Sequence, residues 1–287
     1  MILLTGAAGK TGTTILKYLA KKGAEVRCLV RTQQQADKMI SLGSTETLVG
    51  DLTDQNALAK AIIGIDQIYY IAPNVSPDEL SIGKEIIQLA QHHKVNRFVY
   101  HSVLHPQIEA MPHHWQKMRM EEALFTSGLE FTVLQPCAYM QNILGGWQKI
   151  LSGQFSVPYQ LNTRISIVDL EDVAKVAAKV LSESGHNNAI YELAGPEPLT
   201  QHEVANQIAF SINRPVQAAE QSRVEWETAT IASGMNISQV KILVKMFEYY
   251  DNFGFVGNSS ILEYLLGDKP TTFQQFLARI STSGDER

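Results

Sequence analysis

The chain begins Met1-Ile-Leu-Leu-Thr-Gly6-Ala-Ala-Gly9-Lys-Thr-Gly12-Thr-Thr-Ile-Leu-Lys-Tyr-Leu-Ala20. A short apolar run, residues 1–5, leads directly into three glycines spaced G-x-x-G-x-x-G, and residues 13–20 have the pattern of a helix. Strand, glycine-rich turn and helix form the context in which such glycines bind the diphosphate of a dinucleotide. The stretch therefore predicts a nucleotide-binding βα unit, and a purely structural turn is the alternative.

Each of the three glycines has a physical role in this prediction. Gly6 permits a tight turn off the strand, Gly9 lets the backbone approach a pyrophosphate, and Gly12 lets the helix pack closely. The helix N-terminus offers free N–H groups and a positive dipole end to the phosphates. Lys10 does not have the spacing of a P-loop lysine. From this turn we expect cofactor contacts by Gly6, Ala8, Gly9, Lys10, Thr11 and Gly12.

The next residues continue the alternation of strand and helix. We expect further strands at 24–30, 45–49, 67–71, 97–100 and 131–134, and helices at 33–41, 53–63, 77–92 and 113–126. Six strands alternating with five helical patterns predict an α/β fold with a Rossmann-type, doubly wound parallel sheet. The strands are almost continuously apolar, which is typical of a sheet covered by helices on both faces.

The pattern changes after Pro136. We expect a helix at 139–151, strands at 164–168 and 189–193 around a helix at 170–181, and helices at 201–212, 224–232, 238–249 and 272–280. We therefore expect residues 1–136 to form an NAD(P)-binding Rossmann domain, to which 164–194 returns. Residues 137–163 and 195–287 are expected to form a smaller, mostly helical substrate-binding lobe.

Composition excludes several classes of protein. Of 287 residues, 45% are hydrophobic and 18% charged, as in an ordinary globular protein with a full core. The net charge of −5 leaves no basic footprint for nucleic acid or an anionic membrane, so we expect neither as a direct partner. No apolar stretch approaches the roughly 20 residues that span a bilayer. A strand starting at Met1 argues against a signal peptide, and two cysteines, Cys28 and Cys137, suit a reducing compartment; we expect a cytoplasmic protein.

In a parallel sheet the ligand lies at the carboxyl ends of the strands. Residues following the expected strands are therefore candidates for the same crevice. From this edge we expect further cofactor contacts by Arg31, Asp51, Leu52, Ala72, Pro73 and Pro136. Candidate substrate contacts are Asn74, Ser102, Tyr139 and Asn142.

Several motifs together resemble a known family. They are Thr5–Gly12, Gly50-Asp51-Leu52, His113-x-x-x-Lys117, Thr132-x-Leu-x-Pro136, Tyr139-Met-x-Asn142 and Asp169-x-x-Asp172-Val-Ala. As a set they resemble the NmrA-like group of atypical short-chain dehydrogenase/reductases, over about residues 1–199. The resemblance implies either an NAD(P)H-dependent reductase of quinones, dyes or aromatic compounds, or a regulator that binds the cofactor and catalyses nothing.

Two residues bear on the cofactor. Arg31 follows the second strand directly, where an NAD enzyme usually places an acid against the ribose. A guanidinium there pairs with a 2′-phosphate, so NADPH is favoured over NADH; a solvated surface arginine is the alternative. The resemblance implies that Asp51 accepts a hydrogen bond from the adenine amino group, and a helix cap is the other reading.

The proposed catalytic pair is Lys117 and His113. The resemblance implies that Lys117 holds the nicotinamide ribose. The tyrosine expected four residues before it is replaced by His113, whose unperturbed pKa near ~6.5 allows it to act as a proton donor. Either His113 or water supplies the proton, and a solvent-facing histidine is the alternative reading.

The missing tyrosine also bears on the substrate. A reduced quinone is a stabilised phenolate-type anion that a weak acid can protonate, whereas an alkoxide needs a stronger positioned acid. We therefore expect a flat or aromatic acceptor, with Phe155 and Tyr159 on a loop beside Tyr139. Ordinary packing is the alternative for these aromatic residues, and Cys137 is expected to be a small buried apolar residue.

Two functions remain open at this point. The first is an NADPH-dependent reductase of a quinone or similar conjugated acceptor. The second is a non-catalytic NADP(H) sensor that acts through a protein partner. A sugar epimerase is disfavoured because it normally needs the missing tyrosine. We expect no metal site, helix-capping roles for Asp169 and Asp172, and a possible homodimer.

Overall fold

The structure is a computed structural model that describes residues 1–282. Its contacts divide the chain into two compact units. The first unit comprises residues 1–107, 113–135 and 173–191. The second comprises residues 108–112 and 136–172 and the described residues from Glu192 onward.

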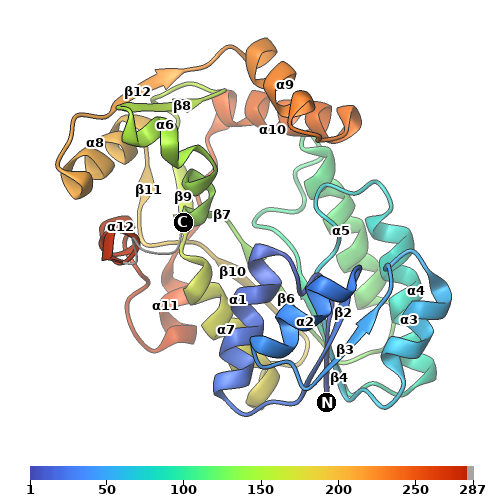
Figure 1. The fold of residues 1–287 in the computed structure, drawn as a ribbon. Helices are drawn as coiled ribbons and strands as arrows, with labels where there is room; N and C mark the ends of the chain where they lie inside the picture. Colours follow the sequence, from blue (N-terminus) through green and yellow to red (C-terminus); the bar gives the residue numbers. More distant parts are fainter. Residues whose placement is uncertain (283–287) are drawn as a thin grey trace. The chain divides into compact units, whose positions relative to one another are not determined.

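A seven-stranded sheet forms the first unit's centre, in the order β10-β6-β5-β4-β1-β2-β3 (Figure 1). The strands are β1 (Ile2–Leu4), β2 (Val26–Val30), β3 (Glu46–Val49), β4 (Gln67–Tyr70), β5 (Arg97–His101), β6 (Phe131–Pro136) and β10 (Ala189–Leu193). Strands β1 to β6 pair in parallel, and β1 lies between β2 and β4. The strand order reverses there, which is the topological switch point beside which such sheets bind ligands.

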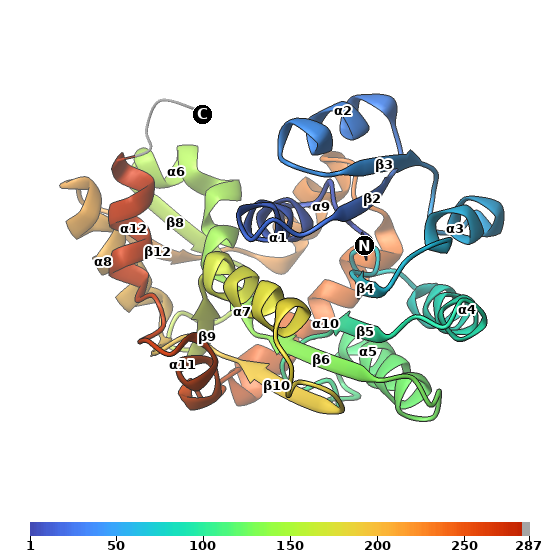
Figure 2. The same ribbon diagram turned by 90° about the horizontal axis from the view of Figure 1, so that it is seen from below.

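Helices cover this sheet on both faces. They are α1 (Lys10–Lys21), α2 (Gln33–Ser41), α3 (Gln55–Ile62), α4 (Glu79–His92), α5 (Pro112–Phe125) and α7 (Leu170–Ser182). Figure 2 shows α1 and α7 on one face and α3, α4 and α5 on the other. On the second face, Tyr70 and Phe98 of the sheet pack with Leu58 of α3, Ile86 of α4 and Met120 of α5, all fully buried. Each such side chain contributes about 1.5–3 kcal/mol by leaving water, so burial of this face stabilises the predicted doubly wound fold.

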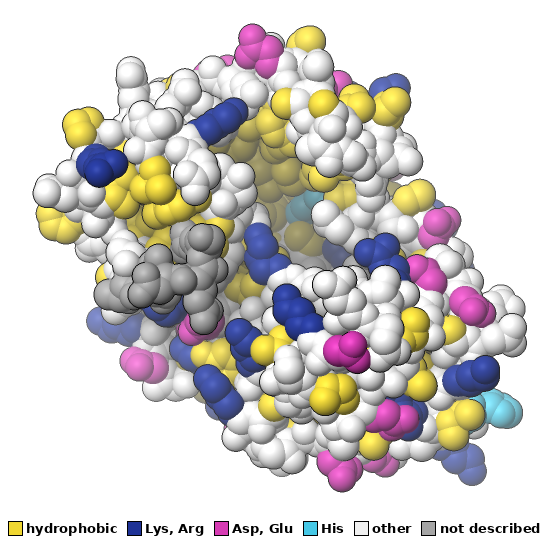
Figure 3. All heavy atoms as spheres, viewed as in Figure 1, with side chains coloured by type: hydrophobic (Ala, Val, Ile, Leu, Met, Phe, Trp, Pro, Cys, Tyr) yellow, Lys and Arg dark blue, Asp and Glu magenta, His cyan; other side chains and the backbone are white. Residues whose placement is uncertain are grey.

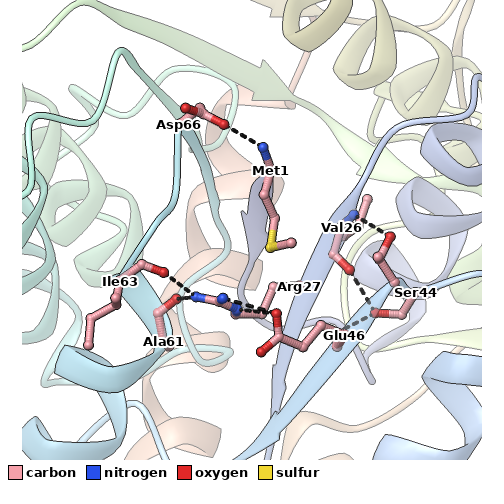
Figure 4. A network of polar contacts seen from close by, with 9 residues as sticks. Met1, Val26, Arg27, Ser44, Glu46, Ala61, Ile63 and Asp66 are labelled. Atoms are coloured by element: carbon pink, nitrogen blue, oxygen red, sulfur yellow. Dashed lines mark hydrogen bonds and ion pairs between the residues drawn. The ribbon is translucent and has the colours of Figure 1, made fainter.

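The amino ends of the central strands carry a polar cluster (Figure 4). The Arg27 guanidinium pairs with Glu46 at 2.9 Å and donates to the backbone oxygens of Ala61 and Ile63 at 2.8 and 2.7 Å. Ser44 Oγ donates to the Val26 carbonyl at 3.0 Å. These bonds join β2 to β3 and to the end of α3, at the edge remote from the glycine turn.

The second unit combines small sheets with helices. One sheet has the order β11-β9-β7, and a parallel pair joins β8 to β12. The strands are β7 (Ala138–Tyr139), β8 (Gln154–Val157), β9 (Ile165–Val168), β11 (Pro198–Leu199) and β12 (Gln217–Glu220). The helices are the 3₁₀ helix η1 (Met140–Gly146), α6 (Trp147–Leu151), α8 (Gln201–Ile212), α9 (Arg223–Ala232), α10 (Ile237–Phe253), α11 (Ser260–Leu266) and α12 (Phe273–Thr282).

Three expectations for this part of the chain were wrong in detail. Residues 164–168 do form a strand, but β9 pairs with β7 and β11 and not with the main sheet. The expected helix at 139–151 begins as the 3₁₀ helix η1 and becomes α-helical only at Trp147. Residues 154–157 are strand β8, where we expected a loop.

Asp169 organises the start of α7, and its side chain is completely buried. Its Oδ1 accepts bonds from the Glu171 amide at 3.1 Å and from Gln141 Nε2 at 2.7 Å. Its Oδ2 accepts from Arg279 Nη2 of α12 at 2.7 Å. Asp169 is thus a helix cap, as expected, and it also joins η1 and α12 to the start of α7.

Within the described residues, no helix is both long and apolar enough to cross a membrane. Cys28 and Cys137 are free and buried. Burial raises the pKa of the Cys28 thiol to about 11 and that of Cys137 to about 12. Both thiols therefore stay protonated and unreactive at neutral pH.

Candidate functional site

The glycine turn after β1 requires glycine at two of its positions, at one because of the backbone angle and at the other because of space. Gly6 adopts φ +59°, in the left-handed region that favours glycine. A Cβ on Gly12 would lie 2.3 Å from the Gly6 oxygen and 2.6 Å from Ala7 Cα. Helix α1 therefore starts directly against the turn, at Lys10. Our expected start at Thr13 was three residues too late, because close packing takes Gly12 into the first helical turn.

The N-terminus of α1 is not capped by a side chain. Gly9 is the N-cap residue and makes no side-chain bond, and its amide donates to the Gly6 oxygen at 3.0 Å. The first intrahelical bond runs from the Thr13 amide to the Gly9 oxygen at 2.9 Å. The amides of Thr11 and Gly12 thus have no acceptor within the helix, and the dipole adds positive potential there. A glycine-walled turn at such a helix end fits a dinucleotide diphosphate.

Arg31 and Asp51 follow β2 and β3, two neighbouring strands of the sheet. Arg31 is exposed, and its amide donates to Gln35 Oε1 at 2.9 Å. Asp51 is also exposed, and its Oδ1 accepts from the amide and the hydroxyl of Thr53 at 2.9 and 2.7 Å. These two bonds, with a smaller effect of the Arg31 charge, lower the pKa of Asp51. Asp51 is not the cap of α3, since Asp54 accepts from Asn56 and Ala57 there.

The segment after β4 is fixed beside the glycine turn. Thr5 Oγ1 donates to the Ile71 oxygen at 2.9 Å and accepts from the Ile71 amide at 2.8 Å. Ala72, the next residue, packs partly buried against the core, as does Leu52 after β3. Pro73 and Asn74 follow and are exposed. Four of the expected contact residues thus lie at the ends of β3 and β4.

Lys117 of α5 lies in a buried polar network that the sequence did not indicate. Its Nζ pairs with Glu79 Oε1 of α4 at 2.8 Å, and Glu79 is 2% exposed. The Tyr100 hydroxyl donates to the same oxygen at 2.5 Å, and the Lys117 ammonium lies 5.5 Å from the centre of the Tyr100 ring. Burial, with the charge of Glu79 next, raises the pKa of Tyr100 well above its ordinary value. The buried Glu79 carboxylate therefore holds the Lys117 ammonium in place.

His113 is largely enclosed, which changes its chemistry. Burial, followed by the effects of His114 and Lys117, lowers the pKa of His113 to about 3. The expected proton donor with a pKa near ~6.5 is therefore corrected to a neutral imidazole, which can offer only an N–H hydrogen bond. Its Nδ1 is buried and has no hydrogen-bond partner among residues 1–282. The solvent-facing alternative does not hold either.

Ser102 follows β5 and is paired with a buried carboxyl group. Its hydroxyl donates to Glu121 Oε1 of α5 in a short hydrogen bond. Gln135 Nε2 of β6 donates to both oxygens of the same carboxyl, at 2.9 and 3.0 Å. All three side chains are at most 6% exposed. Sequence reasoning missed Glu121 and Gln135, although Glu121 is four residues after Lys117 and so shares its helix face.

The remaining candidates belong to the second unit. Pro136 is buried, Tyr139 is half-buried as the residue before η1, and Asn142 is exposed on η1. Phe155 is a core residue of β8 at 8% exposure, so its expected place on a pocket-lining loop was wrong. The Tyr159 ring packs on Phe247 and Tyr250, with ring centres 5.7 Å away in each case.

Two further features of the described residues are the charged side chains on the surface and the side chains that could bind a metal ion. On the face shown in Figure 3, both Lys or Arg and Asp or Glu side chains are exposed. No group of three His, Cys, Asp or Glu side chains that could hold a metal ion occurs within residues 1–282.

Comparison with known proteins identifies the family of this chain. The sequence matches the NmrA-like family over residues 1–277. The chain belongs to the NmrA-like family. This match extends the resemblance seen in the motifs, which ended near residue 199, over nearly the whole chain.

Two relatives of this NmrA-like protein are similar over almost their whole length. It is 26% identical to an NAD(P)H azoreductase of Xenophilus azovorans, over 96% of each chain. It is 24% identical to quinone oxidoreductase 2 of Escherichia coli, over 98% of each chain.

Solved structures share the fold. The NADPH-dependent quinone oxidoreductase QOR2 of E. coli, crystallised with NADPH, has a TM-score of 0.85 at 24% identity, over 98% of this chain and 100% of that one. The triphenylmethane reductase of Citrobacter sp., crystallised with NADP(H), has a TM-score of 0.85 at 21% identity, over 97% and 99%. These likenesses confirm the predicted Rossmann-type fold.

Proposed function

We propose that this protein is an NADPH-dependent oxidoreductase that reduces a quinone or a similar conjugated acceptor. The observation that carries the proposal is the uncapped N-terminus of α1, packed so closely on the glycine turn that Gly12 has no space for a Cβ. The names of the full-length relatives, a quinone oxidoreductase and an azoreductase, support the same chemistry.

The first unit supplies the residues that would hold NADPH. The amides of Lys10, Thr11 and Gly12 face the diphosphate, with Gly6, Ala8 and Gly9 forming the turn beneath it. Exposed Arg31 pairs with the 2′-phosphate, and exposed Asp51 accepts from the adenine amino group. Leu52, Ala72 and Pro73 provide apolar surface at the strand ends. When bound, the cofactor supplies a hydride for reduction of the acceptor.

Lys117 orients the nicotinamide ribose. An ammonium has three N–H donors, and Glu79 uses one of them at 2.8 Å. The other two remain for the ribose hydroxyls. Because Glu79 is buried and also accepts from Tyr100, the ammonium is held in one place before the ligand arrives.

The proton chemistry of the site favours a stabilised anion as product. His113 is neutral and stands where a stronger acid, tyrosine, serves other members of the superfamily. A hydroquinone oxygen needs less acid assistance than an alkoxide oxygen. The chain thus has donors suited to conjugated acceptors, and Asn74 near the end of β4 offers a polar contact for such a molecule.

The test is oxidation of NADPH, followed by absorbance, with benzoquinones, naphthoquinones and azo dyes as acceptors. We expect turnover with at least one of them, and we expect Lys117→Ala to lower kcat/KM by about a hundredfold. Arg119→Ala, an exposed position on the same helix, is the control and should leave the rate unchanged. Calorimetry measures NADPH binding in parallel. Tight binding without turnover on any acceptor would replace the reductase by a cofactor sensor that acts through a protein partner.

A further inference from the structure

Two buried carboxyl groups share one face of α5. Glu79 contacts Lys117 of this helix, and Glu121 lies on the helix itself, one turn further on. Each is 2% exposed. A buried carboxylate is costly unless a cation or several hydrogen bonds compensate it. The two groups must therefore be considered together with the charges around them.

Within residues 1–282, a single cation forms an ion pair with either of these carboxyl groups. Lys117 forms an ion pair with Glu79, and no lysine or arginine among residues 1–282 forms one with Glu121. Three histidines lie near enough to be affected by the Lys117 charge. Burial lowers the pKa of His101 to about 3, of His113 to about 3 and of His114 to about 4, so none is charged at neutral pH. Glu79 uses the single cation, and Glu121 is left with neutral partners.

The hydrogen bonds to Glu121 come from neutral groups, which offset the cost of a buried carboxylate less than a cation would. Gln135 Nε2 donates to the carboxyl at 2.9 and 3.0 Å, and the Ser102 hydroxyl lies in short contact with Oε1. If Oε1 carries a proton, the same contact becomes an O–H donating to Ser102 Oγ, which releases the serine hydrogen for another acceptor. Burial raises the pKa of Glu121, against the smaller opposing effects of Ser102, Gln135 and Lys117.

We propose that Glu121 stores a proton and delivers it through the Ser102 hydroxyl to the oxygen of the reduced acceptor. Ser102 is the residue after β5, at the carboxyl edge of the sheet, and Glu121 lies one turn from Lys117. This inference rests on the proposed function and identifies a donor where the tyrosine is missing. The acceptor gains a hydride and one proton. Ser102 loses its hydrogen to that oxygen and regains one from Glu121, and water reprotonates the Glu121 carboxylate.

The stored proton can be observed without cofactor or acceptor. We would label glutamate side chains with ¹³C at Cδ and follow their NMR signals in the wild-type protein from pH 4 to 9. One signal is expected at the position of a protonated carboxyl at neutral pH. It should vanish in Glu121→Gln and persist in Glu122→Gln, the exposed neighbour on α5. If Glu121→Gln does not fold, Ser102→Ala should move the same signal. A spectrum in which every glutamate is ionised at pH 7 overturns the proposal.

Turnover measurements separate this proposal from the proposed function. We expect Glu121→Gln to lower kcat by roughly a hundredfold with little change in KM, within the range of positioned proton transfer. The wild-type kcat should fall as the pH rises through the Glu121 pKa, and this step should be absent in Glu121→Gln and retained in Glu122→Gln. An active Glu121→Gln with an unchanged pH profile removes the relay and leaves the reductase intact. An inactive wild type that still shows the protonated carboxyl signal removes the reductase instead.

Discussion

At the scale of single residues, Gly12 shows how closely the candidate cofactor site is built. A Cβ there would lie 2.3 Å from the Gly6 oxygen, well inside van der Waals contact, and both atoms nearest to it belong to the backbone. The turn and the helix would have to separate to admit one methyl group. The amides that face a diphosphate would then move together with α1.

We therefore expect Gly12→Ala to weaken NADPH binding at least tenfold and to destabilise the fold by about 1–3 kcal/mol, the usual cost of overpacking. Calorimetry and urea unfolding measure the two effects. Gly145→Ala is the control, since a Cβ there meets no atom within 4 Å. Unchanged affinity in Gly12→Ala would mean that the phosphates bind elsewhere.

Arg31 tests the choice between the two nicotinamide cofactors. A guanidinium attracts the 2′-phosphate and a carboxylate repels it, so Arg31→Asp should lower the affinity for NADPH relative to NADH by roughly ten- to a hundredfold. Arg119→Asp changes the net charge equally at an exposed site on α5 and should leave this ratio alone. If both variants behave alike, the 2′-phosphate does not contact Arg31.

At the scale of elements, apolar periodicity predicted the first unit well. Its six expected parallel strands and five helices are present, because strands buried on both faces and helices with one apolar face leave clear patterns. The two-residue strands β7 and β11 were missed because they are too short for any period. Strand β9 was recognised, but its sheet was not, since pairing partners depend on tertiary packing.

In the candidate site, too, some features could be predicted from the sequence and others could not. Arg31 and Asp51 could be placed from the sequence, because residues that follow parallel strands share one edge of the sheet. The contacts of Glu79 with Tyr100 and of Glu121 with Gln135 join elements distant in sequence, and no local pattern encodes them. The pKa of His113 was misjudged for the same reason, since burial is a tertiary property.

Asp169 offers a test at the element scale. Asp169→Ala removes the cap of α7 and leaves Arg279 without its shortest ion pair, so we expect a loss of about 2–3 kcal/mol in unfolding free energy. Glu171→Ala, which removes only a more exposed pair with Arg279 at 3.4 Å, should cost less than about 1 kcal/mol. Urea denaturation of both variants makes the comparison. Equal losses would show that Asp169 adds nothing beyond a surface pair.

At the scale of the whole molecule, buried neutral histidines set the response to acid. Burial depresses the pKa of His101 from its ordinary 6.5 to about 3 in the folded protein. The unfolded chain therefore binds a proton before the folded one does. The stability this histidine contributes is present above pH 6.5 and is lost as the pH falls toward 3.

We expect the unfolding free energy to fall with acid between pH 6.5 and 4, with His101 contributing about 1.4 kcal/mol per pH unit. His101→Gln should remove that part of the slope, whereas His92→Gln, at an exposed position, should retain it. Denaturant unfolding at several pH values measures the slopes. Glu121 acts in the opposite sense, because its raised pKa makes stability fall as the pH rises above the unfolded value near ~4.3. An unchanged slope in His101→Gln would show that another group governs acid unfolding.

The polar cluster formed by Arg27, Glu46 and the end of α3 has a consequence for how such a protein can change over evolution. It holds β2, β3 and the end of α3 together at the amino ends of the strands, whereas the residues proposed to contact ligands follow the carboxyl ends. Strand register thus does not depend on the side chains that select a cofactor or an acceptor. Mutations can accumulate at the ligand edge, and new substrates can be acquired there, while the opposite edge keeps the scaffold in register.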